Sequence, residues 1–316
     1  MKNNYKNYSL SSSGHSLSGD EKLTFIEKIK WLFLNFINNN SFPKKPDYKR
    51  YAFIKKFYPR YIQSDIDSLL VGNSPSRTIG NLFWKNLDWK FIKKEIGEIN
   101  IFDTGCGAGD YGILINNFSK GIESYLGIDF YPRKNWEEIM TNNPYIYLKK
   151  SSASNIRKLI PKNTNLIITQ SAIEHFKDDL EYFYQIKEYI NESKRNIIQI
   201  HLFPSPACLW LYLFHGYRQY NLKNIQKIIK IFQEEKSYSY LFPLGGNKLN
   251  NLHFKYITIP SLLKKKINLN SDIYNYYLKK YIIYELNKST NNNPSFYALL
   301  IHSNFRNKIF SKEIKN

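Results

Sequence analysis

The stretch Ile99-Asn-Ile-Phe-Asp-Thr-Gly-Cys-Gly-Ala-Gly-Asp-Tyr-Gly112 changes within a few residues from an apolar run to an acidic residue and alternating glycines. Its first residues predict a short buried strand, and the segment 111–118 predicts the helix that follows. Glycines between the two let the backbone turn tightly and approach a ligand. Asp103 at the strand tip would repel a phosphate and attract a cationic amine. The pattern therefore indicates a nucleotide-like ligand that carries an ammonium group.

This loop resembles motif I of the class I S-adenosylmethionine-dependent methyltransferases, in which an acidic residue precedes Gly-x-Gly-x-Gly. Asp103, Gly105, Gly107 and Gly109 match the motif position by position. The resemblance implies S-adenosylmethionine as the cofactor. Cys106 lies inside the same loop, where we expect it to fill space in the cofactor site rather than to react as a thiol. An ordinary glycine-rich turn between a strand and a helix is the alternative.

Two further strand ends extend the predicted cofactor site. The apolar run 125–128 ends in Asp129, about one strand, helix and strand unit after Asp103. Its carboxylate could accept hydrogen bonds from both ribose hydroxyls, as an acidic residue does in dinucleotide folds. After a third predicted strand, 145–148, Ser152 and Ala153 stand where the resembled family often carries Gly-Asp-Ala, whose acid meets the adenine amino group. Serine is a neutral acceptor and makes a weaker bond than a carboxylate.

A fourth predicted strand, 165–169, runs into Gln170-Ser-Ala-Ile-Glu-His175, which is similar to the family segment that ends in Glu-His. The resemblance places Gln170 beside the methionine part of the cofactor. Asn165 stands where the family usually has Asp, and we expect this loss of charge to affect packing more than chemistry. Arg77 lies in a region where the family often reaches over the cofactor, and it could pair with the methionine carboxylate.

Strands and helices alternate through a fifth predicted strand, 196–203, which indicates a parallel sheet covered on both faces. The segments 238–242 and 296–302 are consistent with a sixth and a seventh strand, and the last is antiparallel in the resembled fold. We therefore expect an α/β fold with the doubly wound, seven-stranded, mostly parallel sheet of Rossmann-like methyltransferases. The expected divisions are a disordered tail over 1–19, an N-terminal helical lid over 20–96, and a methyltransferase domain over 97–316 with an insertion over 244–293.

The N-terminal part combines an amphipathic helix with a basic and aromatic segment. The residues 18–21 resemble a capping box, and apolar residues then recur at helical spacing over 23–37. We expect this helix to pack as part of the lid, and the alternative is a helix on a membrane surface with its lysines near headgroups. Over 49–61 bases and rings alternate, which suits either stacking on bases or sugars or an ordinary amphipathic helix.

The 316-residue chain carries a formal net charge of +20, but only 8 of its 46 basic residues are arginine. Basic proteins bind nucleic acid through phosphates, for which arginine is the best suited side chain. Lysine, asparagine, isoleucine and tyrosine are all abundant, as A+T-rich codons would produce without selection for nucleic-acid binding. We therefore keep an RNA substrate as the alternative and not as the main prediction. Cys106 and Cys208 form no disulfide framework, which favours the cytoplasm. The scattered histidines predict no metal site.

Three histidines, His175, His201 and His215, map to the carboxyl edge of the predicted sheet, where doubly wound folds bind ligands. A hydroxyl acceptor must lose its proton, and imidazole is the natural base at neutral pH. For each of the three, a structural histidine is the alternative. Tyr217 and Arg218 could hold an acidic or hydroxylated substrate.

The chain is also similar to methyltransferases found with bacterial surface-polysaccharide synthesis, through the segments 102–109, 171–176 and 215–220. This similarity implies O-methylation of a small molecule or of a saccharide hydroxyl. A lipid-linked acceptor, an RNA-binding methyltransferase and a non-catalytic binding protein that keeps the fold are the alternatives.

Overall fold

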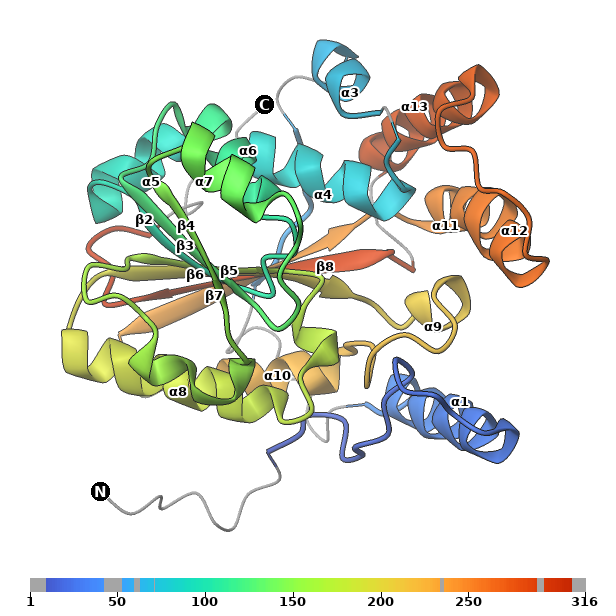
Figure 1. The fold of residues 1–316 in the computed structure, drawn as a ribbon, viewed down its shortest axis with the longest axis horizontal. Helices are drawn as coiled ribbons and strands as arrows, with labels where there is room; N and C mark the ends of the chain where they lie inside the picture. Colours follow the sequence, from blue (N-terminus) through green and yellow to red (C-terminus); the bar gives the residue numbers. More distant parts are fainter. Residues whose placement is uncertain are drawn as a thin grey trace.

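The structure is a computed structural model that describes residues 10–42, 53–59, 63–70, 72–233, 236–288 and 293–308. Its centre is one sheet whose strands lie in the order β1-β7-β8-β6-β5-β2-β3-β4 (Figure 1). The strands are β1 Phe53–Ile54, β2 Asn100–Thr104, β3 Ser124–Asp129, β4 Ile146–Lys150, β5 Leu166–Gln170, β6 Ile197–Pro204, β7 Ser237–Leu244 and β8 Phe296–Ser303.

The strand directions confirm the predicted doubly wound sheet. From β4 to β6 every neighbouring pair is parallel, whereas β8 is antiparallel to both β6 and β7. Seven of the strands correspond to the seven predicted ones. The short strand β1 adds an eighth at the edge, where it pairs in parallel with β7.

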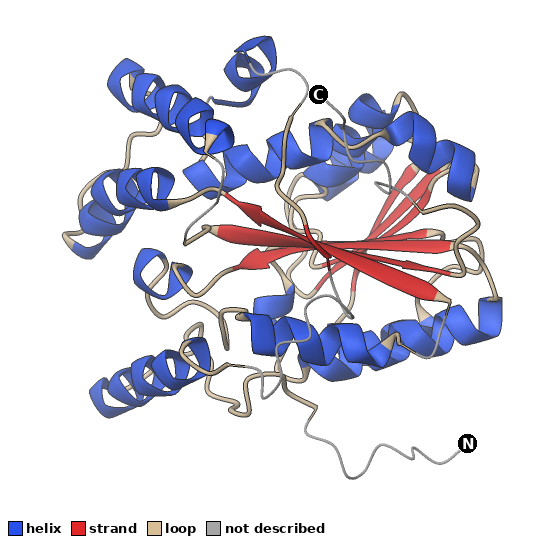
Figure 2. Cartoon of the chain, turned by 180° about the vertical axis from the view of Figure 1, so that it is seen from behind, coloured by secondary structure: helices blue, strands red, loops and turns tan. Residues whose placement is uncertain are grey.

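Helices cover both faces of this sheet, as Figures 1 and 2 show. Ile101 and Ile168 join the apolar core on one face, while Phe102 and Ile167 join the core on the other, because successive side chains of a strand point to opposite faces. The first face carries α4 Pro75–Lys85, α5 Trp89–Ile96, α6 Asp110–Ser119 and α7 Trp136–Asn142, and the second carries α8 Asp179–Ser193 and α10 Leu222–Ile231.

Asn165 fixes the start of β5 against the start of β2. Its side-chain oxygen accepts a hydrogen bond from the backbone of Asn100 at 2.8 Å, and its amide donates to the carbonyl oxygens of Ile96 and Glu98 at 3.0 and 2.7 Å. All these bonds lie at the amino edge of the sheet, away from the carboxyl ends of the strands. The prediction that Asn165 serves packing is therefore confirmed.

Residues 10–19 pack against the domain, so the predicted disordered tail is wrong for them; residues 1–9 lie outside the described part. The backbone and hydroxyl of Ser12 donate to the two carboxylate oxygens of Asp179 at 2.8 and 2.6 Å. The backbone of Leu180 donates to the carbonyl oxygen of Leu10 at 2.9 Å. Composition suggested disorder because the segment is polar, but its polar groups satisfy buried partners on α8.

Helix α1 runs over Phe25–Asn39, and its capping box is formed by Thr24 and Glu27, not by the residues 18–21. The predicted packing of its apolar stripe is also wrong. The buried side chains are Trp31, Asn35 and Asn38, and the stripe faces outward with these exposed residues: Phe25, Ile26, Ile29, Phe33, Phe36 and Ile37. Polar bonds decide the orientation, since the Trp31 indole donates to the carbonyl oxygen of Gly216 at 3.0 Å. Among the described helices, none is long and apolar enough to cross a membrane.

The described part of the basic and aromatic segment, 53–59, contains β1 rather than a helix. Lys55 continues the pairing, since its backbone donates to Leu241 at 2.9 Å, and its ammonium group lies 4.4 Å from the centre of the Tyr240 ring. The remaining positions of 49–61 that carry the prediction, 49–52, 60 and 61, lie outside the described residues. The structure shows a sheet edge over 53–59, so the amphipathic-helix alternative is wrong for these residues, while stacking on bases or sugars stays a prediction.

The insertion before β8 is helical and packs against the N-terminal helices α3 and α4. The Tyr274 hydroxyl donates to the carbonyl oxygen of Asn73 at 2.8 Å, and the Lys279 ammonium group lies 2.6 Å from a carboxylate oxygen of Asp67. The two segments therefore form one helical layer beside the sheet (Figure 1). Its elements are α3 Gln63–Leu70, α11 Asn247–His253, the π-helix η3 Phe254–Thr258, α12 Ile259–Leu262 and α13 Asp272–Asn287.

Candidate functional site

The glycine turn after β2 has three residues in the left-handed backbone region, Gly105, Gly107 and Gly109, with φ of 79°, 56° and 89°. A Cβ atom at Gly105 would lie 2.4 Å from the Cβ of Ala172, and one at Gly109 would lie 2.8 Å from Leu148. At Gly107 a Cβ would meet no atom of the described residues within 4 Å. Gly105 and Gly109 therefore let the turn pack closely on Ala172 and Leu148. At Gly107, in contrast, one side of the turn is not covered by the described residues.

Asp103 lies beneath this turn with only 1% of its surface exposed. One carboxylate oxygen accepts a hydrogen bond from the Tyr125 hydroxyl at 2.5 Å, and the other has no hydrogen-bond partner in the described part of the chain. Burial raises the pKa of Asp103 to about 7; the Tyr125 hydroxyl opposes this rise and the charge of Asp129 adds to it. An unpaired buried oxygen is costly, so a cation bound here would stabilise the ionised carboxylate.

Asp129, at the end of β3, holds the same turn from the side. One of its oxygens accepts a hydrogen bond from the backbone of Gly107 at 2.9 Å, and the other accepts one from the backbone of Tyr131, also at 2.9 Å. The indole of Trp136 donates to the carbonyl oxygen of Gly107 at 2.9 Å. The structure thus brings the second predicted carboxylate directly to the glycine turn.

The predicted adenine residues lie at the neighbouring strand end. Ser151, just after β4, donates from its backbone to the carbonyl oxygen of Asp129 at 2.9 Å. Ser152 caps the 3₁₀ turn η1 (Ala153–Lys158), and its hydroxyl lies 2.6 Å from that of Ser154. Ser152 and Ala153 are therefore adjacent to the Asp129 side of the turn.

The other predicted cofactor residues contact helix α4 or the turn itself. Cys106 is buried, and burial raises the pKa of its thiol, which fits the predicted space-filling role. The guanidinium of Arg77 lies 5.7 Å from the ring centre of Tyr111, the second residue of α6. The side-chain oxygen of Gln170 accepts a hydrogen bond from the indole of Trp84 at 2.9 Å. Arg77 thus extends from α4 to α6, where its Nη1 lies 3.5 Å from the Tyr111 hydroxyl, whereas Gln170 is held by Trp84 of α4.

An acid–imidazole cluster, which comprises Asp20, Glu174, His175 and His215, lies beyond the end of β5. Its turn begins with Ser171 in the left-handed region at φ 52° and continues in the 3₁₀ turn η2 (Ile173–His175). Nδ1 of His175 lies 2.7 Å from Oδ2 of Asp20. The rings of His175 and His215 meet edge to face with 4.5 Å between their centres, and Nδ1 of His215 lies 3.8 Å from Oδ1 of Asp20.

The charges of the cluster fix its hydrogen bonds. Burial raises the pKa of Asp20, but its bond with His175 and the neighbouring charges outweigh burial and bring the pKa to about 2. An ionised carboxylate only accepts, so Nδ1 of His175 carries the proton. Burial lowers the pKa of His175, yet the contacts with Asp20 and the charge of Glu174 raise it above the usual value. Burial and the charge of His175 lower the pKa of His215 to about 4.

Glu174 is the most deeply buried member of the cluster, with 1% of its surface exposed. Neither of its carboxylate oxygens has a hydrogen-bond partner among the described residues, and burial raises its pKa to about 7. Ala172, two residues earlier, is the residue on which Gly105 packs. The cluster and the glycine turn are therefore neighbours at the same edge of the sheet.

His201 does not join the cluster, and we do not retain it as a catalytic base. It lies within β6 with no exposed surface, and its ring nitrogens lie 3.0 Å from the Thr169 hydroxyl and 3.3 Å from the Gln199 side-chain oxygen. Burial lowers its pKa to about 3. It is a structural histidine of the core, because the alternation along β6 points its ring into the packed face under α8.

Arg218 is also structural, so the predicted substrate role is wrong for it. It has no exposed surface, pairs with Asp179 at 3.1 Å, and donates to the carbonyl oxygens of Phe176 and Lys177 at 2.6 and 2.7 Å. Its guanidinium also donates to the hydroxyls of Ser13 and Ser11 in the N-terminal segment. Tyr217 is half-buried, with the Arg218 guanidinium 5.4 Å from its ring centre. Its backbone donates to the carbonyl oxygen of Glu174 at 2.8 Å, so it lies beside the cluster.

Sequence reasoning missed Asp20, the residue that joins the two histidines of the cluster. Its carboxylate also accepts a hydrogen bond from the backbone of Gly216 at 3.0 Å. Gly19 explains why the chain comes so close here, because a Cβ on it would lie 2.3 Å from the backbone of Phe214. The sequence signal at Asp20 was the resemblance of 18–21 to a capping box, which predicted a helix start and no role in the site.

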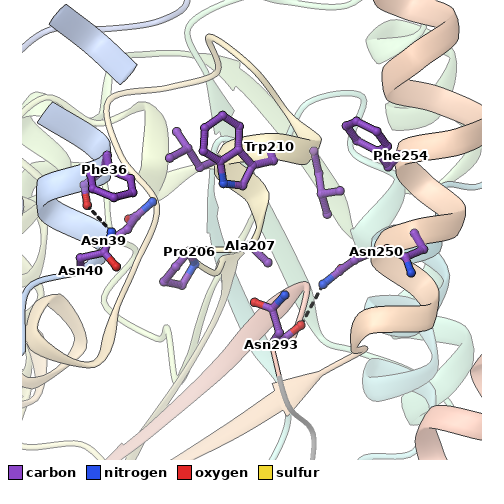
Figure 3. A pocket seen from close by; sticks show the side chains of 12 residues that line it. Phe36, Asn39, Asn40, Pro206, Ala207, Trp210, Asn250, Phe254 and Asn293 are labelled. Atoms are coloured by element: carbon purple, nitrogen blue, oxygen red, sulfur yellow. Dashed lines mark hydrogen bonds between the residues drawn. The ribbon is translucent and has the colours of Figure 1, made fainter. Parts of the chain in front are cut away.

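A pocket of about 400 Å³ opens between α1, α9 (Cys208–Leu211) and α11, at the same end of the sheet (Figure 3). Its wall α9 belongs to the segment that leads to His215. Side-chain amides and apolar or aromatic groups share the lining, and the pocket residues labelled in Figure 3 carry no charge. They are Phe36, Asn39, Asn40, Pro206, Ala207, Trp210, Asn250, Phe254 and Asn293.

The strand order, the antiparallel β8 and the glycine turn after β2 together define a Rossmann-like methyltransferase fold. Among solved structures, the plantazolicin methyltransferase BamL in complex with a triazolic desmethylPZN analog and SAH is 15% identical with a TM-score of 0.46, and the match covers 73% of this chain and 85% of that one.

Two further solved structures are similar to the chain. Coclaurine N-methyltransferase bound to N-methylheliamine and SAH is 10% identical with a TM-score of 0.43, and the match covers 90% of each chain. An S-adenosylmethionine dependent methyltransferase from Mesorhizobium loti is 10% identical with a TM-score of 0.41, covering 68% of this chain and 95% of that one. No family model and no curated protein matches the sequence.

Proposed function

We propose that this protein transfers a methyl group from S-adenosylmethionine to a hydroxyl group. The observation that carries the proposal is that an unpaired acid beneath an open glycine turn lies next to an acid–imidazole cluster. Asp103 and Gly107 belong to the first, Glu174 and His175 to the second, and the contact between Gly105 and Ala172 joins the two. A cationic cofactor and an acceptor that must lose a proton need these two kinds of group at adjacent places.

The residues around the turn fit the cofactor. The unpaired oxygen of Asp103 suits an ammonium group, and the open side of Gly107 leaves room for a ligand against the backbone. Asp129 would bind the ribose hydroxyls by exchanging its present bond to Gly107. Arg77 would bind the carboxylate of the methionine part, and Ser152 would accept from the adenine amino group.

When bound, S-adenosylmethionine supplies an electrophilic methyl carbon, which the acceptor oxygen takes while the electron pair of the carbon–sulfur bond stays on sulfur. The chain's own task is to position the acceptor and remove its proton. Nδ1 of His175 donates to Asp20, so Nε2 is the nitrogen with an open electron pair. The cluster around Nε2 is therefore the place where the acceptor proton leaves.

We propose a saccharide as the class of acceptor, on the strength of the pocket beside α9. Aromatic rings and side-chain amides without charges are the groups that stack on sugar rings and bond sugar hydroxyls. Trp210 is 56% exposed at the centre of this pocket (Figure 3), with Asn39 and Asn250 on opposite walls. These groups would orient a neutral, hydroxyl-rich ligand toward the cluster.

The test is incubation of the full chain with S-adenosylmethionine labelled on its methyl group and three acceptor sets: sugar nucleotides with glycans, total RNA, and small phenols. We expect label to enter a saccharide as a methyl ether and not RNA. If label enters RNA alone, the acceptor class is RNA and not a saccharide. Cofactor binding without transfer to any set would favour a binding protein that keeps the fold, and absence of cofactor binding by calorimetry would end the proposal.

A further inference from the structure

One carboxylate oxygen of Glu174 and one ring nitrogen each of His175 and His215 lie within 4.8 Å of one another. We propose that this triad binds a divalent transition-metal ion, and that the ion activates the acceptor hydroxyl. Binding of the ion follows from the triad alone, whereas its part in catalysis rests on the proposed methyl transfer. The scattered histidines predicted no metal site, because the third ligand, His215, lies far along the chain from the Glu-His pair.

Glu174 shows that the cluster is incomplete without a cation. Its carboxylate is buried and has no hydrogen-bond partner among the described residues. Glu95 provides a comparison inside the same molecule, since it also has little exposed surface, 3% against 1% for Glu174, and also lies near a histidine, with 3.9 Å to His302. Glu95, however, accepts hydrogen bonds from Asn196, Arg306 and Asn307. A buried acid needs such partners, and Glu174 has two imidazoles in their place.

Asp20 supplies the outer part of a metal site. Its carboxylate holds Nδ1 of His175 at 2.7 Å, which leaves Nε2 of that ring facing Glu174 at 4.0 Å. Histidines that bind metals characteristically give their other ring N–H to a carboxylate, which fixes the ring and raises its basicity. The N-terminal segment that carries Asp20 therefore prepares His175 for a ligand on Nε2.

The ligand set selects the kind of ion. Two imidazoles and one carboxylate suit zinc, iron, cobalt or manganese, whereas magnesium and calcium prefer oxygen ligands only. Metal–ligand bonds of about 2.1 Å place tetrahedral ligand atoms roughly 3.4 Å apart. The atoms of the triad, now within 4.8 Å of one another, would close by up to about 1.4 Å around the ion. Three protein ligands leave at least one position for an acceptor.

An ion at this position changes how the hydroxyl loses its proton. The acceptor oxygen binds at the open position, the ion lowers the pKa of the hydroxyl, and the proton leaves to solvent water. The electron pair freed on oxygen forms the bond to the methyl carbon as the carbon–sulfur bond breaks. In this scheme His175 and His215 act as ligands, and neither needs to take the proton.

The experiment uses the full chain, stripped with a chelator and titrated with Co²⁺ in the absence of cofactor. Visible absorption and calorimetry should show one ion bound per chain. Glu174→Gln and His215→Ala should each weaken Co²⁺ binding by at least about 100-fold, and Asp20→Asn by about 10- to 100-fold. His302→Gln is the matched control, a second buried imidazole beside a glutamate, and should bind Co²⁺ like the unaltered chain.

Two outcomes would overturn the metal site. One is equally weak Co²⁺ binding by the unaltered chain and by a folded Glu174→Gln/His215→Ala double variant, which removes the metal site itself. The other is methyl transfer that persists in excess chelator, which removes the ion's part in catalysis, makes His175 the direct base and leaves the proposed function standing. If instead Co²⁺ binds as expected but S-adenosylhomocysteine does not bind, the proposed function fails and the metal site remains.

Discussion

The proposed cofactor half and the proposed acceptor half of the site are built in opposite ways. The cofactor half, Asp103 to Gly109 with Asp129, comes from two adjacent strand ends and one continuous loop. The acceptor half joins Asp20 from the N-terminal segment to His175 after β5 and His215 after β6. A local motif is enough for the first, whereas the second exists only after distant segments have packed together.

The difference suggests that the two halves can be damaged separately. The glycine turn belongs to the core, since Gly105 and Gly109 pack on Ala172 and Leu148. The acceptor half is held by the N-terminal segment, through the buried pair of Arg218 with Asp179 and the bonds to residues 11–13. A substitution in one half should therefore leave the function of the other half intact.

The largest effect is expected from Gly107→Arg. The turn is open at this position, so the added side chain fills the place of the ligand while the core stays packed. Binding of S-adenosylhomocysteine should fall by more than about 1,000-fold, or ~4 kcal/mol, when measured by calorimetry.

Gly97→Arg is the matched control. Gly97 also has a positive φ, 80°, and open space among the described residues, but it lies before β2 at the amino edge of the sheet. It likewise forces a side chain onto a positive φ and adds the same charge. Equal losses of affinity in the two variants would mean that strain, and not the site, explains the effect.

His175→Ala should lower kcat by about 100- to 1,000-fold and leave the affinity for S-adenosylhomocysteine within about twofold. The reason is that His175 belongs to the acceptor half alone. Single-turnover kinetics with the saccharide acceptor would measure the rate of methyl transfer, and calorimetry would measure the affinity for S-adenosylhomocysteine.

His201→Gln distinguishes the cluster from the core. His201 is buried among Thr169, Gln199 and the rings under α8, so its loss should reduce thermal stability and change kcat per folded molecule by less than about threefold. A large loss of kcat in this variant, with the fold intact, would show that the core histidine takes part after all.

Asp103→Asn should weaken cofactor binding by roughly 10- to 100-fold, the usual contribution of a hydrogen bond to a charged group. The carboxyl pKa is raised to about 7, so the negative charge that attracts the ammonium group is present above pH 7 and lost below it. Affinity of the unaltered chain should therefore fall by up to about tenfold for each pH unit below 7, and the variant should lose this slope.

The same raised pKa makes an opposite prediction for stability. An acid whose pKa is higher in the folded state destabilises the free protein as pH rises from about 4 to 7. In thermal unfolding without cofactor, the stability of Asp103→Asn relative to the unaltered chain should therefore increase as the pH rises over this interval. A constant difference across the interval would contradict the burial of an ionising Asp103.

The smallest effect is expected from Trp210→Ala, which removes a ring from the acceptor pocket. The KM for the saccharide should rise by about five- to tenfold, corresponding to ~1 kcal/mol of ring contact, with kcat little changed because the ring lies away from the reacting atoms. Tyr276→Ala, an exposed ring on α13, should leave both parameters unaltered. Steady-state kinetics with both variants would decide whether the saccharide binds in the pocket that Trp210 lines.

Much of the sheet could be predicted because its signals are local. The apolar runs before Asp103 and Asp129 ended where the strands end, and the segment before His175 marked the end of β5. Helix α1 was found by its spacing, but its orientation was not, because Trp31 and Asn38 form polar bonds to a distant loop that outweigh burial of the apolar stripe.

The candidate site divides along the same line. The sequence by itself determined the glycine turn and the acids of the cofactor half, because backbone freedom at Gly107 and the charge of Asp103 are properties of single positions. Only the tertiary structure decided which of three histidines meet, that Asp20 joins them, and that Arg218 is a buried tether. These facts depend on contacts between segments far apart in the chain, and composition, spacing and charge do not encode such contacts one residue at a time.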